Sequence, residues 1–297
     1  MRFVTSIALA LAFSLPASVV HAETPERILS VGGAVTETVF ALGAGKNIVA
    51  VDQTSYYPWA ATHTLPNVGY VRSLAAEGLL SLKSDILIAG PEAGPPQILE
   101  QVSQAGLKVV QLKEGYSPEI AIEHFHQIGK ALDRETEADE LATTFAKDLE
   151  TVKADIAKST SHPRVLFLLS AGRGAPMAGG EHTAADAIIK LAGGINAASA
   201  IKGYKPLSPE AAIGMEPDIL MMMTQTVEAL GGANAVMSAP EIAHTRAAQN
   251  KRLIIVDGLY TLGFGPRTAH ALRDLAIELH PETSFTPLPE RPWTAAK

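Results

Sequence analysis

The chain has 297 residues, of which 47% are hydrophobic and 19% are charged, and it contains no cysteine. Neither a disulfide framework nor a thiolate metal site can therefore form, and the lipid-attachment cysteine that tethers many exported binding proteins is absent. A net charge of −7 without basic clusters argues against nucleic acid as a partner, because phosphate binding needs concentrated lysine and arginine.

The first residues are typical of a secretory signal peptide. Arg2 precedes an apolar run at residues 7–15, and small residues lead to Ala22. The run is shorter than the roughly 20 residues that a membrane-spanning helix needs. We therefore expect residues 1–22 to be removed, and we expect the mature protein to be a free periplasmic protein that is not embedded in the membrane.

Short β-rich apolar runs alternate with helical patterns in both halves of the remaining chain. Such alternation predicts parallel α/β units with helices packed on the sheet faces. The predicted strands cover residues 28–31, 48–51, 86–89 and 109–112 in the first half, and 165–169, 219–223 and 253–256 in the second.

A long charged segment without proline or glycine separates the two halves, at residues 132–158. Apolar side chains recur there at helical spacing, at Leu141, Phe145, Leu149, Val152 and Ile156. We predict a linker helix over 133–160 that joins an N-terminal lobe (23–132) to a C-terminal lobe (161–297). The fold class is then α/β, with two Rossmann-like lobes built on central parallel sheets; a surface helix within one lobe is the alternative.

A weak internal repeat supports two lobes. The stretch E-G-L-L-S-L-K-S-D at 77–85 can be laid over E-A-A-I-G-M-E-P-D at 210–218, with Glu and Asp eight residues apart in both. Each copy predicts a short helix, a turn and a buried strand, although any helix–turn–strand unit can look similar.

Ligands of open α/β sheets lie beyond the carboxyl ends of the strands, so the segments after each strand are candidate binding loops. These segments hold no nucleophile with a partnered base, which argues against an enzyme. They lie at 32–33, 54–56, 91–92, 171–173, 224–225 and 258–260.

The most informative stretch is N-V-G-Y-V-R-S-L-A-A-E-G at 67–78. If residues 69–73 are extended, Tyr70 and Arg72 project to the same side of the chain. An adjacent guanidinium favours the anionic form of a phenol, and tyrosinate is an accepted axial ligand of haem iron. Taken alone, a Tyr-x-Arg pair is more often an ordinary surface pair.

Four further motifs favour a binding role for the Tyr-x-Arg pair over an ordinary surface pair. They are D-Q-T-S-Y-Y-P at 52–58, M-A-G-G-E-H-T-A-A-D-A at 177–187, G-Y-K-P-L-S-P-E at 203–210 and G-F-G-P-R at 263–267. Together with the Gly-Tyr-x-Arg segment, they resemble the periplasmic haem-binding proteins of bacterial haem ABC importers. The likeness covers nearly the whole mature chain. The Gly-Tyr-x-Arg segment is its specific part, while the rest is shared more loosely with siderophore and cobalamin binders.

The resemblance implies a periplasmic binding protein of the helical-backbone type, with haem b in the cleft between its lobes. Tyr70 would match the axial ligand, and Arg72 would match the cation that hydrogen-bonds the phenolate. Relatives often have a second arginine where this chain has Gln225. The lining is expected to include Tyr56, Arg173, Tyr204, Gln225 and Tyr260.

The resemblance also implies that Glu77 and Glu210 dock onto arginines of the transporter's permease, which works with an ATPase. Without a partner, each glutamate would be a solvated residue in a first helical turn. Some relatives bind a second haem through a histidine; here only His182 is close in sequence, and we expect one haem. We thus expect a monomeric, non-catalytic carrier for iron acquisition, with cobalamin or a ferric siderophore as alternative ligands and a periplasmic hydrolase as the rival class.

Overall fold

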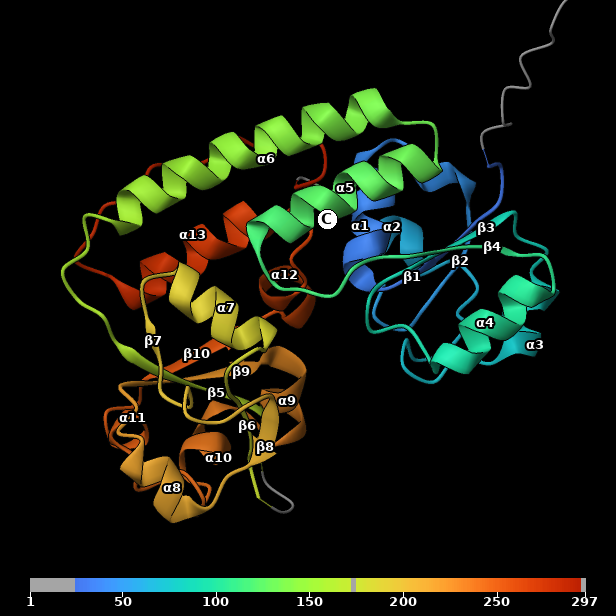
Figure 1. Cartoon of the computed structure of the whole chain (residues 1–297). Helices are drawn as coiled ribbons and strands as arrows, with labels where there is room; N and C mark the ends of the chain where they lie inside the picture. The colour runs from blue at the N-terminus through green and yellow to red at the C-terminus, as the bar shows by residue number, and fades with distance from the viewer. Residues whose placement is uncertain (1–24, 172–174, 295–297) are drawn as a thin grey trace, which may run out of the picture.

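The computed structural model describes residues 25–171 and 175–294, so the expected signal peptide and Arg173 lie outside the described residues. The chain forms two α/β lobes, and helices α5 (Pro118–Ala131) and α6 (Glu135–Ile156) run along one side of the molecule (Figure 1). The predicted α/β class is confirmed. Within the described residues, no helix is both long enough and apolar enough to cross a bilayer.

The N-terminal lobe is built on a four-stranded parallel sheet in the order β2-β1-β3-β4. Strands β1 and β3 lie in its centre and are buried along their whole length, which explains why both read as unbroken apolar runs. The strands are β1 (Ile28–Val31), β2 (Ile48–Val51), β3 (Ile86–Ala89) and β4 (Lys108–Gln111). The helical segments are α1 (Gly33–Ala41), η1 (Gly45–Asn47), α2 (Trp59–Thr62), α3 (Ala76–Ser81) and α4 (Pro96–Gln104).

The sheet of the C-terminal lobe has the order β10-β9-β5-β6-β8 with β7 beside β5, and β10, β9, β5 and β7 form the expected parallel part of it. Strands β6 and β8 are antiparallel to their neighbours. The segment between β5 and β6 is too short for the helical crossover that a parallel pair requires. The strands are β5 (Arg164–Ser170), β6 (Met177–Gly179), β7 (Ile195–Asn196), β8 (Tyr204–Pro206), β9 (Ile219–Met223) and β10 (Leu253–Val256). The helices are α7 (Ala184–Leu191), α8 (Pro209–Gly214), α9 (Thr224–Ala229), α10 (Ala233–Met237), α11 (Arg246–Gln249), α12 (Gly258–Leu262) and α13 (Thr268–Leu279).

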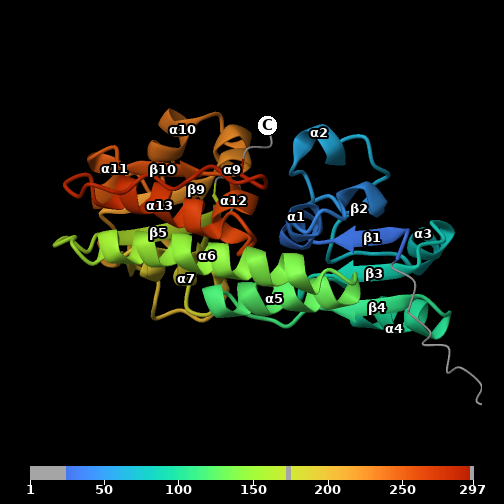
Figure 2. The same ribbon diagram turned by 90° about the horizontal axis from the view of Figure 1, so that it is seen from above.

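Helix α6 lies over both lobes when the molecule is seen from above (Figure 2). Its Phe145 is buried and meets Phe125 of α5 edge to face, with ring centroids 5.3 Å apart. The C-terminal tail contributes polar contacts to the same helix, since Arg291 binds Asp148 in a bidentate manner at 2.6 and 3.0 Å. The tail residues 281–294 are exposed or half-buried, so the tail runs along the surface and is held to α6 by specific contacts.

Candidate functional site

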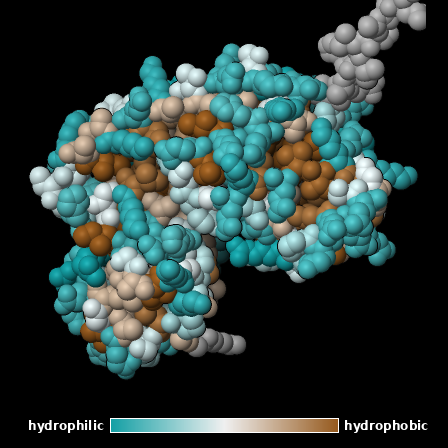
Figure 3. All heavy atoms as spheres, viewed as in Figure 1, coloured by the Kyte–Doolittle hydropathy of each residue, from teal (hydrophilic) through white to brown (hydrophobic). Residues whose placement is uncertain are grey.

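A cavity of about 450 Å³ lies between the lobes. The loops that follow β1, β2, β3, β4, β9 and β10 all line it, so both sheets present the carboxyl ends of their strands to it, as the rule for open α/β sheets predicts. Its volume falls within the roughly 300–1,000 Å³ of small-molecule sites. The space-filling view shows the surface hollowed between the lobes on the side away from α6 (Figure 3).

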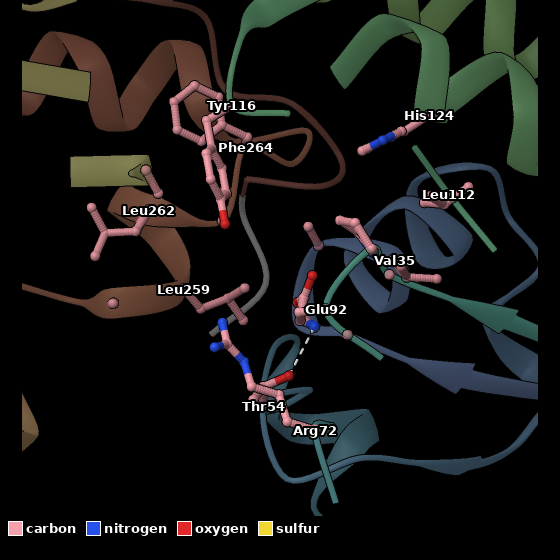
Figure 4. Close-up of a pocket in the computed structure, with 18 of the residues that line it drawn as sticks. Val35, Thr54, Arg72, Glu92, Leu112, Tyr116, His124, Leu259, Leu262 and Phe264 are labelled. Atoms are coloured by element: carbon pink, nitrogen blue, oxygen red, sulfur yellow. Dashed lines mark hydrogen bonds between the residues drawn. The ribbon is translucent and has the colours of Figure 1, made fainter. Parts of the chain in front are cut away.

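The walls of this cleft are largely apolar. Leucines of α12 lie across the cavity from apolar side chains of the N-terminal lobe (Figure 4). Beside them, Tyr116 and Phe264 stand next to each other with ring centroids 5.9 Å apart. The apolar and aromatic lining includes Val35, Leu112, Tyr116, Phe125, Leu259, Leu262 and Phe264. Such walls suit a broad hydrophobic ligand, which they remove from water.

Tyr70 and Arg72 line the cleft together, but not in the way expected from the sequence. The amide of Ser73 donates a hydrogen bond to the carbonyl of Tyr70 at 2.8 Å, so residues 70–73 form a turn and the extended conformation assumed above is wrong. Val71 is buried inside this turn. Within the described residues, neither the Tyr70 phenol nor the Arg72 guanidinium has a hydrogen-bonded protein partner. Tyr70 is 46% exposed, and both groups are free to bind a ligand.

Asp52 fixes the loops that enclose this part of the cleft. Its buried carboxylate accepts hydrogen bonds from the Gly32 amide at 2.8 Å and the Ser55 hydroxyl at 2.6 Å. The other oxygen accepts from the amide and the hydroxyl of Thr54, at 2.8 and 2.6 Å. Four bonds satisfy the buried charge and hold the loop after β1 against the loop after β2. The cleft is therefore preformed on this side.

Tyr56 also lines the cleft, yet its hydroxyl is already used to join the two lobes. It donates to the Asp257 carboxylate at 3.0 Å and accepts from the Leu259 amide at 2.9 Å. Burial raises the pKa of the Tyr56 phenol. A neutral phenol that bridges the lobes is better suited to closing the end of the cleft than to ligating a metal ion.

A buried ion pair joins the lobes beside Tyr56. Arg267 donates two hydrogen bonds to Glu37, at 2.8 and 2.5 Å, and its guanidinium lies 3.5 Å from the centre of the Tyr57 ring. Burial raises the pKa of Glu37, and the bonds from Arg267 oppose that rise. A side chain at Gly33 would collide with Leu259, because a Cβ there would lie 2.4 Å from the leucine methyl group. We call the contacts Tyr56–Asp257, Glu37–Arg267 and Gly33–Leu259 the interlobe seam.

The remaining candidate residues divide between the cleft and other places. Gln225 and Tyr204 line the cleft, and burial raises the pKa of the Tyr204 phenol. Tyr260 lies outside the cleft lining, in a separate cavity next to Arg267, where its hydroxyl donates to Asp274 at 2.8 Å. Exposed His182 lines two further cavities beside the cleft.

The two candidate docking residues lie away from the cleft lining. Glu77 belongs to α3 and Glu210 to α8, and both side chains are exposed. Each glutamate lies in the first turn of its helix. That position is also expected for a solvated glutamate without a partner, because the helix dipole favours negative charge there.

Three lining residues were not named as binding residues from the sequence, although Glu92 lies in a candidate loop and Phe264 in a quoted motif. Tyr116 and Phe264 form the aromatic wall, and Glu92 faces Arg72 across the mouth (Figure 4). Although water reaches Glu92, the cleft walls desolvate its carboxyl and raise its pKa, while Arg72 opposes the rise. Tyr116 follows β4 and could have been found by applying the strand-end rule to that strand. Among the described residues, no cluster of three His, Cys, Asp or Glu side chains could hold a metal ion.

Known proteins share this arrangement over most of the chain. The solved structure of the periplasmic haem-binding protein RhuT from Roseiflexus sp. RS-1, in apo form, is 38% identical, with a TM-score of 0.83 over 86% of this chain and 97% of its own. The haem-binding protein BhuT, solved with two haems, is 37% identical, with a TM-score of 0.81 over 85% and 97%. The vitamin B12-binding protein of Vibrio parahaemolyticus is 27% identical over 67% of this chain and 70% of its own.

A sequence profile described as "Periplasmic binding protein" matches residues 28–259. The match extends from the first strand to the loop after the last one, so it covers both lobes and all the strands that line the cleft. The resemblance inferred from the sequence is confirmed at this level: the chain belongs to the periplasmic binding protein family.

Proposed function

We propose that this protein is the receptor of an ABC importer that carries haem in the cleft between its lobes, with the Tyr70 phenolate as the axial ligand of the ferric iron. The observation that carries this proposal is the pairing of Tyr70 and Arg72 at one cavity, where in the described structure neither side chain has a hydrogen-bonded protein partner. Both groups are available to a ligand rather than engaged in holding the fold together.

The chemistry of the cleft fits haem in two respects. Apolar and aromatic walls remove the faces of a porphyrin from water, which is the main favourable contribution to binding such a ring. A phenolate is a hard anionic oxygen that suits ferric iron, and Arg72, which lines the same cavity, offers a positive charge to a bound phenolate. Gln225 can add a hydrogen bond but no charge, so stabilisation of the phenolate depends chiefly on Arg72.

The relatives support haem more strongly than other ligands. The two structural neighbours named above are haem-binding proteins and share 37–38% of their residues with this chain, whereas the vitamin B12-binding protein shares 27%. The interlobe seam supports a rigid ligand, because a cleft whose width is already fixed loses little entropy on binding. We propose one haem per monomer in the periplasm, with iron acquisition as the purpose of transport.

Titration of the purified protein with ferric haem tests the proposal. We expect a one-to-one complex whose absorption spectrum is that of a high-spin, tyrosinate-ligated ferric haem. The Tyr70→Phe variant keeps the ring and loses only the oxygen, and it should weaken binding by about 100-fold, or about 2.7 kcal/mol.

Two variants control for general damage to the cleft. Tyr204→Phe removes another phenol oxygen from the lining, and His182→Ala removes the candidate ligand of a second haem; each should change the affinity by less than about threefold, within the range of a minor contact. A tyrosinate spectrum that survives in Tyr70→Phe, or a second haem that is lost in His182→Ala, would contradict the assignment of Tyr70 as sole axial ligand.

Cobalamin is the second candidate, because the curated relative from Vibrio parahaemolyticus is a vitamin B12-binding protein. Calorimetric titration with cyanocobalamin separates the two ligands. We expect no measurable heat of binding and no displacement of bound haem. Tight cobalamin binding that is unchanged in Tyr70→Phe would replace haem by a corrinoid as the cargo.

Delivery to the membrane is proposed to use Glu77 and Glu210. Reversing both charges, with Glu77→Arg and Glu210→Arg, should abolish haem uptake by cells while leaving haem affinity intact, because the two helices lie outside the cleft lining. Normal uptake by this double variant would exclude the two glutamates as docking residues.

A further inference from the structure

Helix α3 is anchored to the first strand of its lobe by one arginine and one aspartate. The Arg27 guanidinium donates to the backbone carbonyls of Leu82 and Lys83, at 2.8 and 2.9 Å, where α3 ends. In return, Asp85 accepts a hydrogen bond from the Arg27 amide at 2.9 Å and donates its own amide to the Arg27 carbonyl at 2.9 Å. These contacts fix the direction of α3 relative to β1.

Helix α8 of the other lobe is anchored in the same way. The Arg164 guanidinium donates twice to the carbonyl of Met215, at 2.8 and 3.1 Å, where α8 ends. Asp218 accepts from the Arg164 amide at 2.8 Å and donates its amide to the Arg164 carbonyl at 2.8 Å. Arg164 begins β5 as Arg27 precedes β1, so the two lobes use one design, which we call the Arg–Asp clasp.

The turn between helix and strand is also duplicated. Lys83 and Glu216 occupy the same place in the repeat, and both have positive φ, at 50° and 46°. Neither is glycine, so each lobe holds an unfavourable backbone conformation at the same step. Agreement in the anchor, the turn and the strand shows that the repeat seen in the sequence is a structural equivalence.

Each clasped helix presents a carboxylate and an aliphatic side chain on one exposed face. Leu80 follows Glu77 by three residues and Ile213 follows Glu210 by three, a spacing that places each pair on the same side of its helix. Leu80 is 38% exposed and Ile213 is 42% exposed, although the residue before each of them is fully buried. Both helices lie on the side of their lobes away from α6 (Figure 1).

A single exposed leucine needs no explanation, but a matched pair does. The two helices differ at most positions, yet both keep the acidic residue and the exposed aliphatic residue at equivalent places on the same framework. A partner that meets both surfaces must offer two similar sites, each with a basic side chain beside an apolar one. A pair of equivalent subunits related by a two-fold axis meets that requirement.

We propose that Leu80 and Ile213 are apolar anchors that contact the two permease subunits beside Glu77 and Glu210, the docking residues of the proposed function. The inference deepens the proposed function and rests on it. The glutamates attract and orient the basic partner, while the aliphatic side chains lose their water on docking and slow dissociation. The Arg–Asp clasps hold the two surfaces in equivalent orientations.

The test uses the full-length mature protein and its own permease–ATPase complex reconstituted in lipid nanodiscs. Leu80→Ser and Ile213→Ser are made singly and together, and the dissociation constant of the receptor–transporter complex is measured. Each single change should weaken docking by about 10-fold and the pair by about 100-fold, since distant sites act additively. The dissociation rate should carry most of the change.

The matched control is Ile255→Ser with Ile277→Ser, which changes aliphatic side chains of 45% and 36% exposure outside the repeat. It should leave docking within about twofold of wild type, as surface changes away from a contact do. Wild-type docking by Leu80→Ser with Ile213→Ser, or equal weakening by the control pair, would overturn the proposal. A loss confined to one of the two positions would contradict the pairing with equivalent subunits.

Haem titration of the same variants separates this inference from the proposed function. We expect unchanged haem affinity in all of them, because Leu80 and Ile213 do not line the cleft. A wild-type protein that docks through these side chains but binds no haem would remove the proposed cargo and keep the docking surface. If the protein binds haem but its docking is unaffected by the changes at Leu80 and Ile213, the proposed cargo stands and the docking surface is removed.

Discussion

The two lobes share a framework but contribute different chemistry to the cleft. The N-terminal lobe supplies the polar mouth, with Tyr70, Arg72 and Glu92, while the C-terminal lobe supplies α12 and Phe264 of the apolar wall. Both lobes nevertheless carry the same Arg–Asp clasp. The duplicated unit therefore determines how each lobe is built and presented, and the loops outside it determine what the cleft binds.

The largest effect is expected where the lobes meet. Arg267→Met leaves the Glu37 carboxylate buried without its partner, and should lower the free energy of unfolding by about 3 kcal/mol in urea denaturation. Because this pair crosses the interlobe seam, the variant should also widen the distribution of distances between spin labels at Ser103→Cys and Glu228→Cys, one in each lobe. The chain has no other cysteine to label.

A second bidentate pair provides the control for the seam. Arg291→Met leaves Asp148 of α6 buried without its partner, with a similar loss of stability. It lies between α6 and the C-terminal tail, so the interlobe distances should keep their wild-type width. Equal broadening in both variants would show that general destabilisation, and not the seam, controls the separation of the lobes.

The next effect tests the polar mouth. Arg72→Met keeps the length of the side chain but removes its charge, and should weaken haem binding by about 30-fold, or about 2 kcal/mol, because the phenolate loses its neighbouring cation. The absorption spectrum of the complex, followed during titration, reports both affinity and ligation. Arg72→Lys should recover part of the loss, and wild-type affinity in Arg72→Met would remove the electrostatic role assigned to the N-terminal lobe.

A smaller effect is expected where the tail joins α6. Asp155 accepts hydrogen bonds from Lys158 at 2.6 Å and from the Thr286 amide at 2.7 Å, which lower its pKa to about 2. A carboxyl whose pKa is lowered by folding stabilises the fold at pH values above its pKa in the unfolded chain. This stabilisation is lost as the pH falls toward 2. Asp155→Asn should therefore cost about 1.5 kcal/mol at pH 7 and much less near pH 2, as urea titrations at the two pH values will show.

An exposed pair on the same helix gives the contrast. Arg134 binds Glu137 at 2.7 Å and lowers its pKa, but the pair lies at the surface, where solvent screens it. Glu137→Gln should leave the urea midpoint unchanged at both pH values. A shift as large as that of Asp155→Asn would mean that helix charge, and not the attachment of the tail, is being measured.

The smallest effect tests the polar contribution of the C-terminal lobe. Gln225 is exposed at the cleft, and among the residues that the structure describes its side chain makes only a weak contact with the Met223 sulfur, at 3.9 Å. Gln225→Ala should reduce haem affinity by about two- to threefold, which corresponds to one neutral hydrogen bond. A loss comparable to that of Arg72→Met would contradict the view that the N-terminal lobe supplies the main polar contacts of the cleft.

The sequence predicted the apolar strands well because most of their side chains are buried, Ile255 of β10 being exposed. Residues 28–31, 48–51, 86–89, 219–223 and 253–256 match β1, β2, β3, β9 and β10. Strands β6, β7 and β8 were not predicted, since two or three residues are too few to show a period. The antiparallel pairing of β6 and β8 follows from chain reversal, which apolar patterning does not encode.

Within the cleft, the sequence predicted which loops meet but not the direction of every side chain. Tyr260 follows Leu259 by one residue on a helix, so its side chain points about 100° away and leaves the cleft. The Glu37–Arg267 pair joins residues that are 230 positions apart, and no local sequence pattern in either segment predicts it. Tyr70 and Arg72 reached the same cavity through a turn instead of a strand, which local alternation could not reveal.

The interlobe seam bears on how a transporter distinguishes a loaded receptor from an empty one. The contacts that join the lobes oppose their separation, so we expect the outer outline of the molecule to change little when a ligand enters. Under the proposed function, empty copies would then compete with full ones for the same membrane complex. Recognition of the cargo would take place at the opening of the cleft, and release would require the membrane complex to strain the seam itself.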